Sequence, residues 1–196
     1  MRVKNRIYQF KITLWGIRPP IWRRIQVPET YTFWDLHVAI QDAMGWADYH
    51  LHEFEITSPQ SRGKTRIGIP EGDFDREVLP GWKQKIADYF TQENRTANYM
   101  YDFGDGWEHK IELEKILPRE KNVKYPTCIK GKRACPPEDC GGIGGYYNLL
   151  EIMGNPNHEE YDDMLEWLGE EFDPEHFDIN EVMFDDPNKR RKIAIG

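Results

Sequence analysis

Cysteine is scarce in this sequence. The 196 residues contain three cysteines, and all of them lie between positions 128 and 140. Three cysteines cannot all pair within one chain, and secreted disulfide scaffolds usually carry an even and denser set. We therefore expect reduced thiols rather than a disulfide framework.

Long apolar runs are also missing. The sequence has no stretch of about 18 consecutive apolar residues, the length that a membrane-spanning helix needs. The first residues alternate between polar and apolar and do not form the apolar centre of a signal peptide. These absences predict a soluble, cytoplasmic protein that has no membrane partner.

Basic residues are absent from residues 151–186, which contain fourteen Asp or Glu. The rest of the chain holds 20 acidic and 26 basic residues, so it is mildly basic although the whole chain has a net charge of −8. Such a division is typical of a nucleic-acid partner for the basic part or a protein partner for the acidic helices. A solvated acidic face is the simpler interpretation, and we prefer it.

Aromatic residues, in contrast, are plentiful. They make up 13% of the chain and include seven Trp, which supply large side chains for a core. A chain of this length suits one core. We therefore expect a single α+β domain over residues 1–196, with an acidic helical part at 144–186 and a short, solvated basic tail at 187–196.

Strands are predicted through the first 117 residues, where apolar and polar side chains alternate. The clearest cover residues 7–14, 21–28 and 50–56, followed by a hairpin over 97–117 with a Gly-Asp-Gly turn. Residues 58–80 are rich in Gly, Pro and charge, which predicts a long connection that contains one short strand at residues 66–69.

One early segment predicts a helix over residues 33–44. Thr32 is placed to be its N-cap, Asp35 completes a capping box, and Gly45 ends the helix. Short helices are predicted later, at 145–153, 157–169 and 178–186. The fold class that follows is α+β, with a mainly antiparallel sheet in the first two-thirds, one long early helix and short helices in the C-terminal third.

Five motifs together resemble a known family. They are PPIWRRIQVP, TFWDLHVAIQDAMGW, HLHEFEI, YDFGDGWEHKIELE and ACPPEDCGGIGGYYNLLE. Their order and length resemble the family of uncharacterised proteins named after the third open reading frame of a root-inducing (Ri) plasmid, over nearly residues 7–181. The resemblance implies no established activity.

Some members of that family are described as transposon resolvases, so the resemblance implies a link to mobile elements. A serine recombinase needs a nucleophilic serine among several arginines. The serines to consider here are Ser58 and Ser61, which lie in the loop TSPQSRGK. This chain therefore gives the resolvase description little support.

The cysteine segment, residues 128–142, is the first candidate metal site. Cys135 and Cys140 have a spacing found among zinc ligands, and Cys128 lies six residues before Cys135. A fourth ligand would have to be a histidine brought in by the fold, and His109 is our first choice. The alternative, which we prefer, is that these cysteines pack a loop and that no zinc binds.

Histidines and carboxylates give two further candidates. His50 and His52 project from one strand face and could bind a ligand or a metal, although histidines hydrogen-bonded at a core edge are commoner. Asp102, Asp105 and His109 lie around the hairpin turn, where carboxylates and an imidazole could perform acid–base catalysis. Aspartates in such turns also commonly bond their own backbone.

Arginines near the N-terminus are candidates for phosphate binding. Arg23 and Arg24, next to Trp22, could contact phosphates, or their aliphatic stems could cover the sheet. From these residues we expect a non-enzymatic binding or interaction module, linked to mobile elements or nucleic acid. The alternative is a metal-dependent, hydrolase-like enzyme that uses the histidines, aspartates and cysteines.

Overall fold

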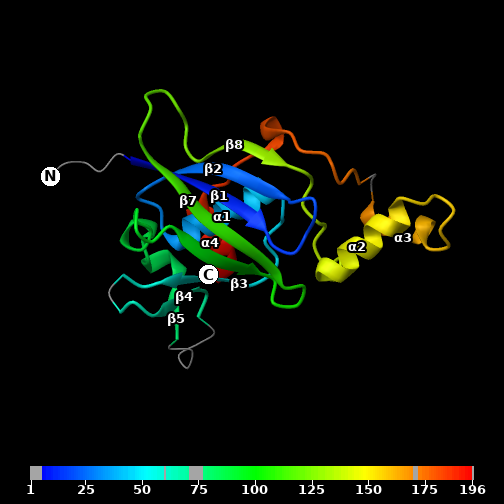
Figure 1. The fold of residues 1–196 in the computed structure, drawn as a ribbon, viewed down its shortest axis with the longest axis horizontal. Helices are drawn as coiled ribbons and strands as arrows, with labels where there is room; N and C mark the ends of the chain where they lie inside the picture. Colours follow the sequence, from blue (N-terminus) through cyan, green and yellow to red (C-terminus); the bar gives the residue numbers. More distant parts are fainter. Residues whose placement is uncertain (1–5, 60, 71–76, 170–171, 196) are drawn as a thin grey trace.

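An eight-stranded sheet forms the body of the molecule (Figure 1). The computed structural model describes residues 6–59, 61–70, 77–169 and 172–195. The strands are β1 (Arg6–Leu14), β2 (Trp22–Pro28), β3 (His52–Thr57), β4 (Lys64–Gly68), β5 (Val78–Pro80), β6 (Thr96–Tyr101), β7 (Trp107–Pro118) and β8 (Thr127–Lys132). Their spatial order is β5-β4-β3-β6-β7-β1-β2-β8. All neighbours pair antiparallel except β4 and β5, which confirms the predicted fold class.

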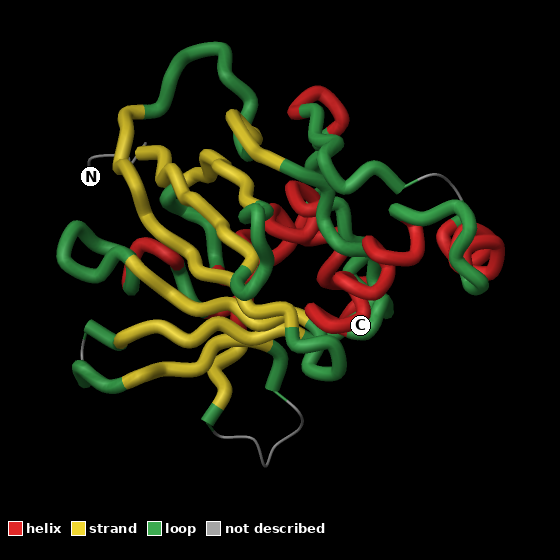
Figure 2. Tube along the Cα trace, turned by 45° about the vertical axis from the view of Figure 1, so that its right-hand side comes forward, coloured by secondary structure: helices red, strands yellow, loops and turns green. Residues whose placement is uncertain are grey.

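The helices lie outside this sheet. They are α1 (Phe33–Met44), α2 (Gly142–Met153), α3 (Tyr161–Leu168) and α4 (Pro187–Ile195), with short 3₁₀ turns η1 (Gly81–Lys83), η2 (Ile86–Asp88) and η3 (Ile179–Glu181). Figure 2 shows the strands as one curved layer, and in Figure 1 α2 and α3 extend away from it to the right. None of the helices in the described ranges has the length and apolar character needed to cross a bilayer.

Helix α1 has the predicted boundaries. The Thr32 side chain accepts a hydrogen bond from the Asp35 backbone N–H, and the Asp35 carboxylate accepts one from the Thr32 N–H at 2.8 Å. Gly45 ends the helix in the left-handed region at φ 96°, where glycine carries no steric penalty. The capping box and the C-terminal glycine predicted from sequence are therefore confirmed.

The core lies between α1 and one face of the sheet. Alternate residues of the central strands, such as Phe10, Phe54 and Ile111, are fully buried there. The residues between them are polar and face away from this core, as in antiparallel sheets that are covered on one side. This alternation explains why the strand predictions succeeded in the first two-thirds of the chain.

The C-terminal third differs from the prediction in two places. Residues 178–186 were expected to be helical but contain only η3, followed by extended backbone. The tail at 187–196 was not expected to be helical, but its described residues form α4, which contacts α1 although none of these residues is buried. Helix α4 contacts the distant helix α1 and η3 contacts the distant strand β8, and local periodicity reports neither contact.

Candidate metal centre

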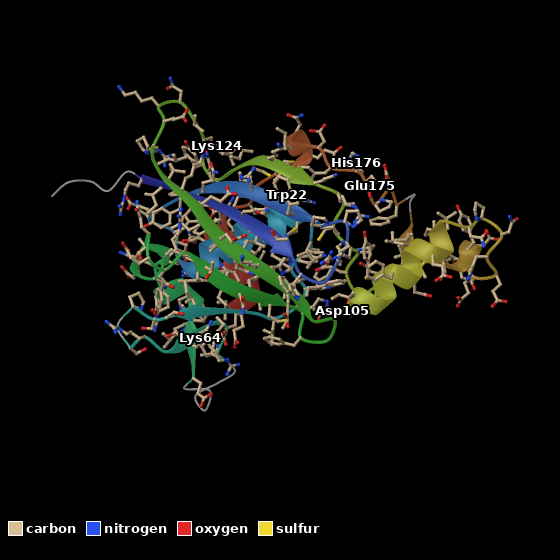
Figure 3. The ribbon with its side chains drawn as sticks, in the orientation of Figure 1. Trp22, Lys64, Asp105, Lys124, Glu175 and His176 are labelled. Atoms are coloured by element: carbon tan, nitrogen blue, oxygen red, sulfur yellow. The ribbon has the colours of Figure 1, made fainter. Side chains whose placement is uncertain are left out.

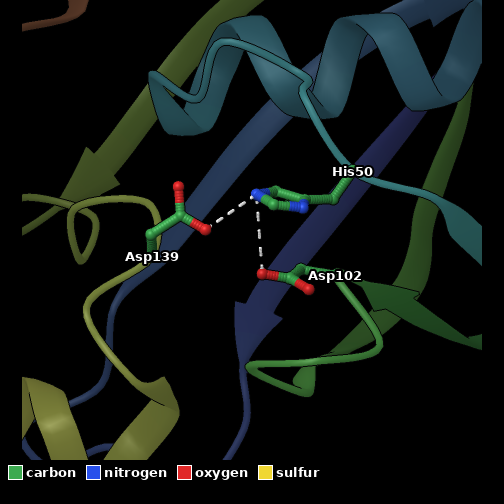
Figure 4. A group of neighbouring side chains, drawn as sticks. All are labelled: His50, Asp102 and Asp139. Carbon is green, nitrogen blue, oxygen red and sulfur yellow. Dashed lines mark ion pairs between the residues drawn. The ribbon is translucent and has the colours of Figure 1, made fainter.

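Three side chains from distant segments converge at one end of the sheet. They are His50, Asp102 and Asp139, and one ligand atom from each lies within 4.8 Å of the others. The His50 Nε2 atom is 3.1 Å from Asp139 Oδ1 and 3.7 Å from Asp102 Oδ2 (Figure 4). We call this group the triad.

His50 lies in a loop, residues 45–51, that connects α1 to β3. The strand prediction placed its start at this histidine, but β3 begins at His52. Asp48 adopts φ 66° two residues earlier, a conformation that strands exclude. The turn there leaves the His50 side chain 29% exposed, beside the two aspartates.

Asp102 comes from the turn after β6. Its backbone N–H donates to the Leu51 carbonyl at 3.0 Å, which fixes the turn against the loop that carries His50. Its Oδ1 accepts a hydrogen bond from the Gly104 N–H at 2.8 Å. The carboxylate is held by one oxygen, as expected for an aspartate in a turn, and its other oxygen faces the imidazole.

Asp139 lies in the loop of residues 133–141 between β8 and α2. The residue before it, Glu138, accepts hydrogen bonds from the Tyr101 hydroxyl and from the Ala47 N–H, the latter at 3.2 Å. The Trp46 indole N–H donates to the Pro136 carbonyl at 2.9 Å. These bonds join the loop of Asp139 to the loop of His50, so the two side chains are positioned together.

The Tyr101–Glu138 bond lies beside the triad. The Tyr101 ring centroid is 5.9 Å from that of His50, and Glu138 is the residue before Asp139. Burial, followed by the bond to Glu138, raises the pKa of Tyr101 well above its ordinary value, so the phenol keeps its proton and remains a donor. The Tyr49 N–H also donates to this phenol oxygen at 3.1 Å. Tyr101 therefore ties residues 45–51 to residues 133–141 without contributing a ligand atom itself.

The His50 Nε2 atom is buried and makes no hydrogen bond of acceptable geometry. A buried polar atom without a partner is costly, so it calls for a specific explanation. Two carboxylates with a combined charge of −2 face the same nitrogen. Imidazole nitrogen and carboxylate oxygen are ligands for first-row divalent cations.

The other histidine of the pair, His52, lies in a separate buried cluster. Its ring stacks on His37 with centroids 3.4 Å apart. His37 bonds the Tyr99 hydroxyl at 2.8 Å and the Asp48 carboxylate at 2.9 Å. Burial lowers the pKa of His37 and His52 well below the ordinary value, so both are neutral. In the part of the chain that the structure describes, His50 and His52 do not belong to the same group of potential ligands.

The three cysteines are divided between a strand and a loop. Cys128 is in β8, Cys135 and Cys140 are in the loop that follows, and all three are free thiols. Burial raises the pKa of each, to about 12 for Cys140, which disfavours the thiolate that binds metal. Among the described residues, no group of three potential ligands includes a cysteine, so the zinc site stays a prediction.

His109 and Asp105 are also placed apart from each other. His109 is 2% exposed in β7, where its ring lies beside Trp46 and Tyr99, and burial lowers its pKa to about 4. Asp105 is at the hairpin tip, next to the start of α2 (Figure 3), and accepts a bond from the Gly141 N–H at 3.2 Å. Of the three acid–base candidates, only Asp102 belongs to the triad.

The two arginine candidates have partners within the protein. Arg23 is 2% exposed, donates to the Ala43 carbonyl at 2.7 Å and lies over the Phe177 ring. Arg24 makes a two-pronged ion pair with Glu114, with distances of 2.6 and 2.7 Å. The guanidinium groups of both arginines are therefore engaged within the protein.

Asp139 is the triad residue that sequence reasoning did not single out. The sequence pointed to Asp139 only indirectly. Asp139 lies in the cysteine segment, and we had expected that a metal site in this segment would need a histidine from elsewhere in the fold. A histidine does reach the segment, but it is His50 rather than His109, and it meets an aspartate rather than a thiol.

Comparison with known proteins first defines the family of this chain. The chain matches the family of plasmid pRiA4b ORF-3-like proteins over residues 6–181. It belongs to this family, as the motifs implied.

Two relatives match this chain over most of its length, one by sequence and one by structure. The uncharacterized protein y4hQ of Sinorhizobium fredii (strain NBRC 101917 / NGR234) is 32% identical over 164 residues, covering 83% of this chain and 81% of the relative. The crystal structure of MM3350 from Methanosarcina mazei Go1, a protein of unknown function, matches with a TM-score of 0.86 and 54% identity. That match covers 91% of this chain and 98% of the other, so the same fold extends across both proteins.

Proposed function

We propose that this protein is a binding module whose ligand is a divalent metal ion held by His50, Asp102 and Asp139. The observation that carries the proposal is the convergence of one imidazole nitrogen and two carboxylate oxygens within 4.8 Å. The buried Nε2 atom of His50 supports it, because this atom faces two carboxylates without a hydrogen bond of acceptable geometry and a metal ion would bind all three groups.

Charge favours a cation over a polyanion at this end of the molecule. The triad brings two carboxylates together. Glu138 lies on the loop that carries Asp139, and Asp105 lies on the turn that carries Asp102. A phosphate backbone would be repelled here, whereas a cation would relieve the repulsion between the carboxylates. The nucleic-acid partner predicted from the mildly basic part of the chain therefore has less support at this end of the molecule than a metal ion.

Mn²⁺ is the most discriminating probe of this proposal. Carboxylate ligands suit Mn²⁺, whereas soft thiolates select Zn²⁺ and similar ions. A Mn²⁺ titration therefore reports on the triad with little interference from Cys135 and Cys140. Zn²⁺ would test both sites at once and could not separate them.

The test compares Asp139→Asn with Asp163→Asn. Asparagine preserves the shape of Asp139 and tolerates its φ of 58°, but it removes one charge and one good ligand. We expect calorimetric titration of chelator-treated protein to give one Mn²⁺ per wild-type chain, with affinity reduced about tenfold or more in Asp139→Asn. Asp163 is exposed on α3, so its substitution controls for the change in net charge.

Equal Mn²⁺ affinity in wild type and Asp139→Asn, or stoichiometric binding in neither, would contradict the proposal. A loss of affinity in Asp163→Asn equal to that in Asp139→Asn would assign the effect to net charge alone. Far-ultraviolet circular dichroism of each variant shows whether the fold is retained.

A metal-dependent hydrolase is the second candidate function. It is favoured by the number of ligands, because three protein ligands leave coordination positions open for a water molecule, as catalytic sites do. The Asp139 side chain is 65% exposed, so solvent reaches the group from the side of this carboxylate. Mn²⁺-dependent hydrolysis of simple phosphate or carboxylate esters that disappears in Asp139→Asn would favour the enzyme, and its absence would favour the binding module.

A further inference from the structure

Helix α4 is held on α1 by a small number of specific contacts. None of its described residues is buried, and Ile193 is 87% exposed. The Trp34 indole N–H donates to the Pro187 carbonyl at 2.8 Å. With so little apolar area buried by α4 itself, polar contacts must supply much of the docking energy.

Arg190 supplies the largest set of these contacts. Its guanidinium lies 2.7 Å from Asp42 and 3.7 Å from Asp48, and it also bonds Asp185. The side chains of Asp42 and Asp48 are only 4% and 8% exposed. Removing the cation would leave two buried carboxylates without their counter-charge, which is strongly unfavourable.

Asp48 connects this helix to the triad. It lies in the loop of residues 45–51, two positions before His50. Its Oδ1 contacts His37 of α1 at 2.9 Å and its Oδ2 faces Arg190 of α4 at 3.7 Å. The carboxylate therefore lies between two helices, bonded to His37 and in ion-pair range of an Arg190 Nη1 atom that makes no hydrogen bond, while the Asp48 backbone occupies the left-handed region.

The opposite side of the loop is held independently of α4. The Ala47 N–H donates to Glu138 and the Tyr49 N–H donates to Tyr101. The loop therefore has two anchors, one on the triad side and one on the α4 side. Loss of one anchor should loosen the loop without unfolding it.

We infer that α4 is a clamp on residues 45–51, and that its docking through Arg190 holds His50 in the position that binds metal. The C-terminal helix thereby regulates the affinity of the triad, and any partner that captures α4 would weaken metal binding. The coupling to metal rests on the proposed function, whereas the clamp itself does not.

Two measurements on the full chain test this inference. The variant is Arg190→Gln, and the matched control is Lys192→Gln, which removes a charge from an exposed position of the same helix. Amide hydrogen exchange of metal-free protein reports on the clamp. Mn²⁺ titration of the same samples reports on the coupling.

We expect Arg190→Gln to speed amide exchange in residues 46–51 by at least about fivefold while exchange in β7 stays unchanged. The Mn²⁺ dissociation constant should rise by about fivefold or more, the lower end of typical coupling between sites. Lys192→Gln should leave both quantities at wild-type values.

The outcomes separate the two proposals. If wild type does not bind Mn²⁺, the proposed function and the coupling fail, and the exchange data alone decide whether the clamp exists. If wild type binds Mn²⁺ and Arg190→Gln changes neither exchange nor affinity, the inference is overturned and the metal site stands. Faster exchange in β7 as well as in residues 46–51 would indicate general destabilisation and would also overturn it.

Discussion

His50 shows at the residue scale why the triad is more than a chance group of charges. Its Nε2 atom is buried, faces two carboxylates and has no hydrogen bond. An ordinary ion pair between His50 and one aspartate would leave the carboxylate of the other aspartate without a bonding partner at Nε2. A metal ion satisfies the imidazole and both carboxylates at once, because each contributes a lone pair to the same centre.

His109 allows a pH prediction that concerns one residue. Burial lowers its pKa to about 4 in the folded protein, against about 6.5 in the unfolded chain. Between these values the unfolded chain binds a proton that the folded protein does not, so stability falls as the pH falls from about 6.5 to about 4. Above this window the effect is absent, and below it the effect is complete.

We therefore expect the stability difference between wild type and His109→Gln to move in favour of the variant as the pH falls. The shift should total about 3 kcal/mol over this window, at about 1.4 kcal/mol per pH unit. Urea unfolding of both proteins at several pH values between 7.5 and 4 measures it. A difference that is independent of pH would show that His109 titrates normally in the folded state.

Helix α2 shows at the element scale how the loop of Asp139 is fixed. A Cβ atom at Gly145 would lie 1.8 Å from the Cys140 carbonyl oxygen, and one at Gly142 would lie 2.5 Å from the Asp105 carbonyl oxygen. The start of α2 therefore packs backbone to backbone against the hairpin turn at Asp105 and against the loop of residues 133–141. This close approach explains why Gly142 and Gly145 have no side chain.

The glycines of α2 provide a matched pair of substitutions. Gly145→Ala should displace the Cys140 carbonyl, destabilise the protein by about 2 kcal/mol and weaken Mn²⁺ binding by moving Asp139. Gly144 has open space around its Cβ position, so Gly144→Ala should stabilise the protein by up to about 1 kcal/mol through helix propensity. Urea unfolding and Mn²⁺ titration of the two variants check both signs. Similar effects of both substitutions would contradict this account of the packing.

The elements that sequence predicted well are those whose signals are local. The capping box of α1 and the alternation of β1 and β7 needed only neighbouring residues. Helix α4 was missed because its sequence has no apolar stripe, and it is held instead by Arg190 and by the Trp34 bond to Pro187. Strand β8 was missed because it lies within the cysteine segment, which the spacing of thiols made look like a loop.

At the scale of the whole molecule, the triad assembles three segments that are far apart in sequence. His50 follows α1, Asp102 follows β6 and Asp139 precedes α2. Sequence identified His50 and Asp102 as candidates, but for different sites, because no local pattern reports that their loops meet. Asp139 could be found only once the fold had brought its loop to the end of the sheet.

The charges on the solvent face of the sheet show whether this face suits nucleic acid as a partner. Lys11 and Arg24 lie beside the Trp22 ring there, at 5.4 and 5.2 Å from its centroid. Arg24 forms an ion pair with Glu114, and Lys110 forms one with Glu112 on the same strand, β7. This face carries charges of both signs in ion pairs, which distinguishes it from the one-sided basic surface that phosphate binding requires.

The central claim is that His50, Asp102 and Asp139 form a divalent cation site. Anomalous diffraction near the manganese absorption edge, from crystals of the full chain grown with Mn²⁺, tests it most directly because it locates the ion. The account predicts one strong anomalous peak bonded to His50 Nε2 and to an oxygen of each aspartate. A peak at the cysteine segment or elsewhere, or no ordered peak at saturating Mn²⁺, would contradict it.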